Sequence, residues 1–443
     1  MNIVIAGASG FIGSELMKII PNAKGISRGE PKTSRWIQAD LFSRTNCQKA
    51  LENCDVAFYL VHSMLPTSHL DQGNFEDFDL IIADNFARAC KINKVKQVIY
   101  LAGIIPRETD TNELSPHLKS RQEVENILKS SGVPVTTLRA GLIIGDKGSS
   151  FNILKNLAIQ IPFLAYPKWL LSKMEPVSLE KVLASLKYCI NKEETFNKTF
   201  DLTSGQPTSY KDLILLTRKI LNKNTKSIEL SIPDFLIKSW FLTFSDAPKN
   251  LVFPLLESLK HDMLTRPNKV LDINFKDKSL EEMLTDAISK GEKTPQAFKS
   301  RPNNKIVRSI QRINVKCTDD AKIYQIYFDW LVGFYKPFME VKTDGELCIF
   351  KFLNIPLLVL KHVPSSSEKR RELLSISGGI LVNKKQKIGR IEFRKLDDCI
   401  IVAIHDFMPS LPWFIYVISQ AIIHQTTMNH FKKHLEKHVD FCK

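Results

Sequence analysis

The stretch IVIAGASGFIG, residues 3–13, decides which fold the first part of the chain can adopt. Its first four residues predict a buried strand, and three glycines follow at a spacing of three, at the mouth of a helical segment. Each glycine meets a separate requirement: one allows a tight turn, one lets backbone amides approach a pyrophosphate, and one lets a helix pack closely on a strand. We therefore predict a dinucleotide site here. The residues expected to contact the cofactor are Gly7, Ser9, Gly10, Phe11, Ile12 and Gly13.

Strand-like and helical patterns alternate downstream of this stretch, as far as about residue 145. The runs VAFYLVH (56–62), QVIYLAG (97–103) and VTTLRAGLIIG (135–145) are strand-like, whereas FEDFDLIIADNFARACKIN (75–93) has helical spacing. This βαβ order predicts an α/β fold, namely a Rossmann-type doubly wound parallel sheet. Helical patterns interrupted by Pro and Gly dominate from about 150 to 290, which predicts a smaller, mainly helical lobe packed on the first.

The clearest linker is KGEKTPQAFKSRPNNK, residues 290–305, which is polar and contains Pro, Gly and Asn. Stretches of this composition separate domains. We predict an NAD(P)-binding domain over 1–295, with a core at 1–150 and the second lobe at 150–290, and an α+β domain over 306–443. In the α+β domain, alternating strands such as GRIEFRKLDDCIIVAIHDF and a closing helix from Pro412 to about His438 predict an antiparallel sheet.

The net charge of +15 and the pI of about 9.3 raise the question of an acidic partner. Lys and Arg are spread along the whole chain and no nucleic-acid-binding motif is present, so we predict no nucleic-acid partner. No apolar run reaches the ~18 residues that span a bilayer. The nearest, WFIYVISQAII at 413–423, predicts a core helix. We therefore expect no transmembrane segment, and weak peripheral contact of the protein with a membrane is left open. Because the chain begins directly with a strand pattern, we expect a cytoplasmic protein without a signal peptide.

Metal binding is not predicted. The eight cysteines include no C-x-x-C pair, so they do not indicate a zinc site. His430, His434 and His438 follow one another at a spacing of four residues, which can place three ligands on one helix face. No carboxylate or cysteine is placed to complete such a site, so we expect a solvated helix face there.

The end of the second predicted strand, AKGISR (23–28), bears on the choice between NAD and NADP. An NAD-selective protein presents an Asp or Glu there to the ribose diol, whereas this chain has Ser27 and Arg28. A guanidinium suits a 2′-phosphate, so we predict that NADP is preferred, with a plain surface role of Arg28 as the alternative. Asp40 and Leu41 end the third strand, where an adenine ring would lie. Asp40 either accepts from the exocyclic amine or caps the next helix.

Together with further motifs, these residues resemble a known superfamily. The motifs are the glycines at 7–13, Asp-Leu at 40–41, YLVHSM (59–64), LRAGLIIG (138–145) and EPVSLEKV (175–182). The set resembles the atypical and extended short-chain dehydrogenase/reductase superfamily over roughly residues 1–295, and within it the NAD(P)H-binding branch that includes NmrA-like regulators and the nucleotide-binding accessory subunit of respiratory complex I. The resemblance implies that the nicotinamide side is lined by Leu60, Val61, His62, Ala102 and Gly103.

The catalytic residues of that superfamily are replaced in this chain. Active members carry a Ser or Thr after the fifth strand and a Tyr-x-x-x-Lys on the next helix, where the lysine lowers the pKa of the tyrosine. Here Ala102 and Gly103 follow the strand, and aligning Arg121 with the lysine places His117 in the tyrosine position. His117 is therefore the candidate acid or base, and Arg121 the candidate anchor for the cofactor. The alternative is that His117 only begins an ordinary helix.

The C-terminal domain resembles, in outline, the helix-grip fold of START-related ligand-binding domains. The resemblance rests on the order of its elements and on AIHDFMPSLPWFIYVISQAIIHQTTMNHF, residues 403–431. It implies an apolar cavity and a small hydrophobic ligand. Two functions are open at this point. One is an NADP(H)-dependent oxidoreductase acting on a hydrophobic carbonyl or quinone-like ligand. The other is a non-catalytic NADPH-sensing or assembly protein that has lost the Ser/Tyr/Lys set, so the sequence leaves open whether the chain is an enzyme.

Overall fold

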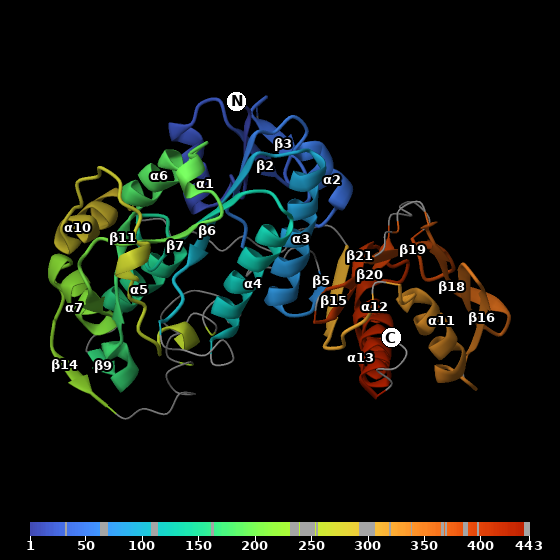
Figure 1. The fold of residues 1–443 in the computed structure, drawn as a ribbon. Coiled ribbons are helices and arrows are strands. Elements are labelled where there is room, and N and C mark those ends of the chain that lie inside the picture. The colour runs from blue at the N-terminus through green and yellow to red at the C-terminus, as the bar shows by residue number, and fades with distance from the viewer. Residues whose placement is uncertain are drawn as a thin grey trace. The chain divides into compact units, whose positions relative to one another are not determined.

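The computed structural model describes the chain in two compact units. One consists of Met1–Leu65 with Asp79–Lys299, and the other of Pro66–Phe78 with Ser300–Lys443. We call them the N-terminal unit and the C-terminal unit, and Figure 1 labels their helices and strands. The residues that the structure does not describe are 32, 63–69, 108–113, 161–163, 231–238, 240–252, 254–255, 292–305, 319, 338, 365–366, 368–369, 384–388, 397 and 438–443. Most of the predicted linker at 290–305 therefore lies outside the described residues, as does His438.

Seven parallel strands form the main sheet of the N-terminal unit, in the order β12-β7-β6-β4-β1-β2-β3. The strands are β1 (Ile3–Ala6), β2 (Lys24–Ser27), β3 (Trp36–Gln38), β4 (Val56–Tyr59), β6 (Gln97–Gly103), β7 (Val135–Ala140) and β12 (Thr199–Leu202). The chain winds outward from β1 to β3 and then crosses back to β4 on the other side of β1. This order confirms the predicted Rossmann-type sheet, and its switch point lies between β1 and β4.

Helices cover both faces of this sheet (Figure 1). They are α1 (Phe11–Ile19), α2 (Arg44–Ala50), α3 (Phe75–Ile92), α4 (Pro116–Ser130) and α6 (Leu179–Tyr188). Apolar side chains of α1 and α6 share one core with β1 and β4. On the other face, Tyr59 of β4 packs edge-on against Phe86 of α3, and the Tyr100 hydroxyl on β6 donates to the Arg121 carbonyl on α4, 3.1 Å away. The helix α4 is thereby held over the carboxyl ends of β4 and β6.

A smaller lobe completes the N-terminal unit. Its helices are α5 (Ser149–Gln160), α7 (Tyr210–Ile220) and α10 (Leu280–Lys290), which enclose a second core containing Phe151, Leu213 and Leu284. Its short segments are β8 (Ile143–Ile144), β9 (Leu164–Tyr166), η1 (Lys168–Leu171), β10 (Lys173–Met174), β11 (Val177–Ser178), η2 (Glu193–Thr195), β13 (Thr208–Ser209), β14 (Ser227–Glu229) and η3 (Pro267–Lys269). A mainly helical lobe was predicted here from the sequence.

The C-terminal unit is built on an eight-stranded sheet in the order β16-β17-β18-β19-β20-β21-β15-β5. The strands are β5 (Leu70–Gln72), β15 (Val307–Ile313), β16 (Glu340–Asp344), β17 (Leu347–Phe352), β18 (Ile355–His362), β19 (Arg371–Gly378), β20 (Arg390–Lys395) and β21 (Ile400–Phe407). All neighbours are antiparallel except β5 and β15. The predicted α+β class with an antiparallel sheet is confirmed.

The helices of the C-terminal unit are α11 (Ile323–Phe334), α12 (Trp413–Ile418) and α13 (Gln420–Lys437). Residues of α11 and α13 share one apolar core with the sheet, so both helices pack on the same face. The predicted closing helix is interrupted at Ser419, whose φ of −125° and ψ of −86° are not helical. Among the described residues, no helix is long and apolar enough to cross a bilayer.

The start of the C-terminal unit differs from the sequence prediction, which placed residues 66–78 in the first domain. Within the C-terminal unit, β5 pairs in parallel with β15, and Arg312 Nε lies 2.7 Å from Asp77 Oδ1. Gly73, with a φ of +144°, passes so close to Ile310 that an added Cβ would lie 2.6 Å from its carbonyl oxygen. These pairings join residues about 235 positions apart, so no local sequence pattern predicts them.

Candidate dinucleotide site

Two glycines of the first loop, Gly7 and Gly13, occupy positions that admit no side chain, and Gly10 leaves little room for one. Gly7 has a φ of +85°, and a Cβ there would lie 2.6 Å from the Leu60 carbonyl oxygen. A Cβ on Gly13 would collide with the Gly7 carbonyl oxygen, and one on Gly10 would lie 3.2 Å from the same atom. Gly10 N also donates to that oxygen over 2.9 Å, which closes the turn. The geometry thus shows the tight turn and the close packing of helix on strand that were expected from the sequence.

The N-terminus of α1 has the features of an anion-binding site. The helix begins at Phe11, and its N-cap Gly10 supplies no side-chain hydrogen bond to the first amides. Its first turn contains no acidic residue. Free amides and the positive end of the helix dipole favour a pyrophosphate at this point. The ring of Phe11 is packed closely by Gly145 and Gly148, where added Cβ atoms would lie 2.6 and 3.1 Å from it.

The residues predicted for the nicotinamide side lie together at one edge of the sheet. The strand β4 lies between β1 and β6 and is parallel to both, so their carboxyl ends meet. Leu60, Val61 and His62 directly follow β4, and Ala102 and Gly103 end β6. The Leu60 amide donates to the Ala6 carbonyl over 3.0 Å, which keeps this segment beside the glycine loop.

The residues predicted for the adenosine side follow β2 and β3. Ser27 ends β2, its Oγ accepts from the Gly29 amide over 3.2 Å, and the side chain of Arg28 is exposed. Asp40 Oδ1 accepts from the Phe42 amide over 3.1 Å. It closes a turn and does not cap α2, because Ser43 is the N-cap of that helix. Leu41 is buried.

A buried carboxylate, which the sequence analysis missed, organises the nicotinamide edge. Asp79 on α3 has no exposed surface and forms an ion pair with Arg121 of α4. The same carboxylate oxygen accepts from Ser120 Oγ over 3.0 Å and lies 3.1 Å from His62 Nδ1. Arg121 Nη1 donates to the Val61 carbonyl over 3.4 Å. An acid within the apolar run FDLIIAD was the one signal in the sequence that pointed to this position.

The pKa values of both histidines at this edge lie below the ordinary value of an imidazole. Burial and then the charge of Arg121 lower the pKa of His62, although Asp79 opposes them. His62 Nδ1 lies 2.8 Å from Arg121 Nη2 and 3.1 Å from Asp79 Oδ2, so it either accepts from the guanidinium or donates to the carboxylate, according to its tautomer. Burial, then His62, then Arg121 hold the pKa of His117 well below its ordinary value. Burial lowers the pKa of Arg121, but Asp79 offsets this and keeps it above its usual value.

His117 and Arg121 lie on one side of α4, as predicted from their spacing. The rings of His117 and His62 are 5.1 Å apart between centroids. His117 Nδ1 is buried and has no hydrogen-bond partner among the described residues. Because the lowered pKa of His117 disfavours its protonated form, this histidine is a poor substitute for the tyrosine that donates a proton in the superfamily that the sequence resembles. Ala102 and Gly103 offer no hydrogen-bonding side chain either.

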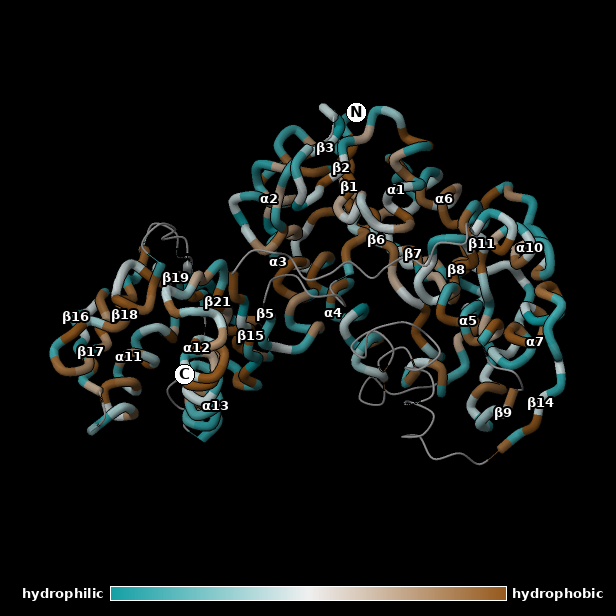
Figure 2. The backbone as a smooth tube through the Cα atoms, turned by 180° about the vertical axis from the view of Figure 1, so that it is seen from behind, coloured by the Kyte–Doolittle hydropathy of each residue, from teal (hydrophilic) through white to brown (hydrophobic). Residues whose placement is uncertain are grey.

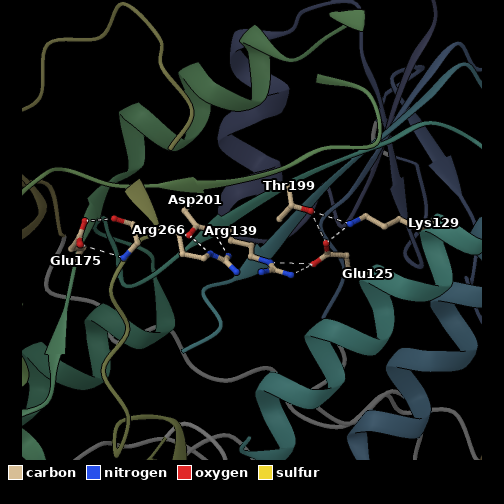
Figure 3. Close-up of polar contacts among 8 residues, drawn as sticks. Glu125, Lys129, Arg139, Glu175, Thr199, Asp201 and Arg266 are labelled. Carbon is tan, nitrogen blue, oxygen red and sulfur yellow. Dashed lines mark hydrogen bonds and ion pairs between the residues drawn. The ribbon is translucent and has the colours of Figure 1, made fainter. Parts of the chain in front are cut away.

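The position of α4 is fixed by a buried polar network, drawn in Figure 3. Glu125, one turn after Arg121, accepts from Arg139 Nη2 of β7 over 2.8 Å and from Lys129 Nζ over 2.6 Å. Thr199 of β12 donates to the same carboxylate over 2.8 Å. The network ties the helix to two strands of the sheet.

The same row of polar groups continues into the smaller lobe (Figure 3). Asp201 of β12 pairs with Arg266 over 2.6 Å, and Glu175 accepts from Thr265 Oγ1 over 2.7 Å. Asp201 is fully buried and Glu175 is nearly so. These contacts hold the segment before η3 against the sheet.

Comparison with known proteins supports nicotinamide-cofactor binding by the N-terminal unit. Residues 3–158 match the model of the NAD dependent epimerase/dehydratase family. The matched segment contains the glycine loop, the nicotinamide edge and α4.

One curated relative is the auxiliary protein GraX of Staphylococcus aureus, which is 31% identical over 110 residues. The match covers 23% of this chain and 36% of GraX, so this chain spans about a third of the length of that relative.

One solved structure supports the fold of the N-terminal unit, and a complex of the same protein is also similar. The triphenylmethane reductase of Citrobacter sp. is 15% identical, and the alignment covers 65% of this chain and 100% of that chain with a TM-score of 0.51. The complex of that reductase with NADP(H) has the same identity and coverage and a TM-score of 0.49. At this identity the likeness concerns the fold alone.

Proposed function

We propose that the N-terminal unit binds NADP(H) and transfers its hydride to an apolar, quinone-like acceptor. The observation that carries this proposal is the cluster of Asp79, Arg121, His62 and His117 at the carboxyl edge of β4 and β6, in which Arg121 pairs with Asp79 beside two imidazoles of lowered pKa. Such a cluster suits a bound nicotinamide ribose but supplies no acidic proton.

The preference for the phosphorylated cofactor is supported by the end of β2. Ser27 and the exposed Arg28 stand where an acid would select the ribose diol of NAD. An arginine at this position suits a charge-assisted contact with a 2′-phosphate.

The choice of acceptor follows from the missing proton donor. Hydride addition to an aldehyde or ketone creates an alkoxide, which is as basic as hydroxide and needs a proton from the enzyme. A quinone that accepts a hydride becomes a hydroquinone monoanion. The conjugate acid of this anion is a phenol, with a pKa of about 10. Solvent can protonate this anion after the transfer. The nicotinamide is oxidised, the quinone is reduced by two electrons, and no side chain changes its protonation state.

The test is oxidation of NADPH by the full-length protein with benzoquinones and naphthoquinones, compared with aldehydes of similar size. We expect turnover with quinones and none with aldehydes. The variant His117→Ala should leave the quinone rate within about twofold, because no acid is used. The variant Arg121→Met should weaken NADPH binding, whereas Lys187→Met, which removes an exposed cation on α6, should not. Aldehyde reduction lost in His117→Ala would overturn the proposed chemistry.

A non-catalytic NADPH sensor or assembly protein is the second candidate. It is favoured by the replacement of the Ser/Tyr/Lys set with Ala102, His117 and Arg121, and by the engagement of Arg121 with Asp79. NADPH binding without oxidation by any quinone, together with a cofactor-dependent change in protease sensitivity, would establish this alternative.

For the C-terminal unit we propose an apolar ligand, in line with its resemblance to helix-grip domains. The packing of α11 and α13 on one face of the sheet supports this arrangement. Native mass spectrometry of the full-length protein after mild extraction would detect a co-purified ligand. A protein mass equal to that of the bare chain would oppose the proposal.

A further inference from the structure

We propose that Arg312, on β15 of the C-terminal unit, is a positioning residue for the cofactor edge of the N-terminal unit and acts on it through the helix α3. This inference rests on the proposed binding of a nicotinamide cofactor beside His62 and Arg121. It goes beyond that proposal because it gives the C-terminal unit a part in cofactor affinity.

The segment that the C-terminal unit takes from the first part of the chain is flanked by the cofactor edge on both sides. Residues 66–78 belong to the C-terminal unit, whereas residues 1–65 and 79–299 belong to the N-terminal unit. In the sequence, His62 lies shortly before this segment and Asp79 follows it directly. His62 Nδ1 and Asp79 Oδ2 lie 3.1 Å apart, so the residues on the two flanks are in contact. A displacement of the segment therefore acts on residues of the cofactor edge.

The described part of this segment is fixed within the C-terminal unit. Its strand β5 pairs in parallel with β15, which aligns Leu70 with Val307 and Gln72 with Ser309. Gln72 Nε2 also donates to the Ala421 carbonyl at the start of α13, over 3.2 Å. The start of α3, three residues after β5, is therefore tied to this sheet.

Two buried aspartates in the first turns of α3 form ion pairs with different elements. Hydrophobic residues predominate along this helix (Figure 2), so the two acids are exceptions in its sequence. Asp77 Oδ1 lies 2.7 Å from Arg312 Nε of β15, whereas Asp79 pairs with Arg121 of α4. Side chains two positions apart project about 200° apart around a helix, so the two carboxylates leave α3 on opposite sides. One ion pair fixes the helix start to β15, and the other fixes it to α4.

The Asp77 carboxylate depends on cations of the C-terminal unit. It is 5% exposed, and burial raises its pKa, while the charges of Arg312 and then Lys432 oppose this rise. A buried carboxylate that loses its counter-charge is strongly disfavoured. Removing the charge of Arg312 therefore favours a shift of the helix start that returns Asp77 to water. Asp79 shifts with it, because the two residues belong to one helical turn.

The position of Asp79 determines the arrangement of the side chains at the cofactor edge. Its carboxylate contacts Arg121, Ser120 Oγ and His62 Nδ1. Arg121 in turn donates to the Val61 carbonyl over 3.4 Å. A shift of Asp79 thus moves the guanidinium and the imidazole that are expected beside the nicotinamide ribose. The ion pair of the C-terminal unit is thereby linked to cofactor affinity.

Titration of the full-length protein with NADPH, followed by fluorescence, measures this link. Arg312→Met should raise the dissociation constant about fivefold, the lower end of the usual range for coupling between two sites. Asp77→Asn removes the same ion pair and should weaken NADPH similarly, and the double variant should bind about as weakly as each single one. Arg312→Lys, which keeps a cation beside Asp77, should bind as the parent does. Lys342→Met is the control, because it removes a cation at the opposite edge of the same sheet.

Hydrogen exchange of the protein without cofactor tests the coupling by itself. Arg312→Met should speed the exchange of the amides of residues 119–125 in α4, whereas Lys342→Met should leave their exchange unchanged. This measurement separates the inference from the proposed function. A parent protein that binds no nicotinamide cofactor would refute the proposed function, and the exchange of α4 would still decide whether Arg312 acts on the cofactor edge.

Any of three results would overturn the inference. One is parental affinity for NADPH in both Arg312→Met and Asp77→Asn. Another is a loss of affinity in Arg312→Lys or in Lys342→Met as large as that in Arg312→Met, since the effect would then not depend on the charge beside Asp77. The last is unchanged exchange of α4 in Arg312→Met.

Discussion

The substitution Asp79→Asn tests whether the buried carboxylate holds Arg121 in place. The two side chains are 1% and 6% exposed, so removing one charge leaves the other buried without its counter-charge. Breaking a buried ion pair in this way costs about 3–5 kcal/mol. The amide of Asn retains one oxygen that accepts from Arg121 and Ser120, so we expect the lower end of this range, about 3 kcal/mol, in the free energy of unfolding of the N-terminal unit.

Urea denaturation of the full-length protein, followed by circular dichroism, measures this loss. The double variant Asp79→Asn/Arg121→Met is the decisive comparison, because it removes the uncompensated charge. We expect the double variant to be more stable than Asp79→Asn alone, which appears as a coupling energy between the two positions. A loss below about 1 kcal/mol for Asp79→Asn, or purely additive effects of the two substitutions, would refute the reasoning.

Three further predictions concern the glycine loop, the end of β2 and the network of Figure 3. Gly13→Ala should abolish NADPH binding in a fluorescence titration and lower the melting temperature, because its Cβ would collide with backbone atoms of Gly7 and Ala8; retained affinity would contradict this. Arg28→Ala should weaken NADPH about 10- to 100-fold and leave NADH nearly unchanged, and equal losses would exclude a contact with the 2′-phosphate. Burial raises the pKa of Glu125, but Arg139 and Lys129 offset this and hold it below its ordinary 4.5. The ionised Glu125 therefore stabilises the fold above pH 4.5, and this contribution is lost as the pH falls through the lower pKa of the folded state. In urea titrations, Glu125→Gln should lose less stability on acidification than the parent protein. Parallel curves of stability against pH would contradict this prediction.

The sequence predicted most of the cofactor loop because its signals are local. Gly7, Gly10 and Gly13 are needed by contacts within a few residues or with the next parallel strand, and the period of the apolar residues shows which segments are strands. The same local signals predicted that His117 and Arg121 share one side of a helix. They did not predict Asp79, because its partner Arg121 is 42 positions away and the pairing depends on α3 and α4 lying side by side.

The sequence by itself determined the class of both folds and the position of the glycine loop, and it shows Ala102, His117 and Arg121 where the superfamily that it resembles carries Ser, Tyr and Lys. Only the tertiary structure decided that Asp79 pairs with Arg121 and that β5 joins the sheet of the C-terminal unit. The physical reason is the range of the interactions. Backbone geometry and hydrophobic period depend on residues that are close in the sequence, so they can be recognised from it. Ion pairs and sheet neighbours join residues that come close only once the chain has folded.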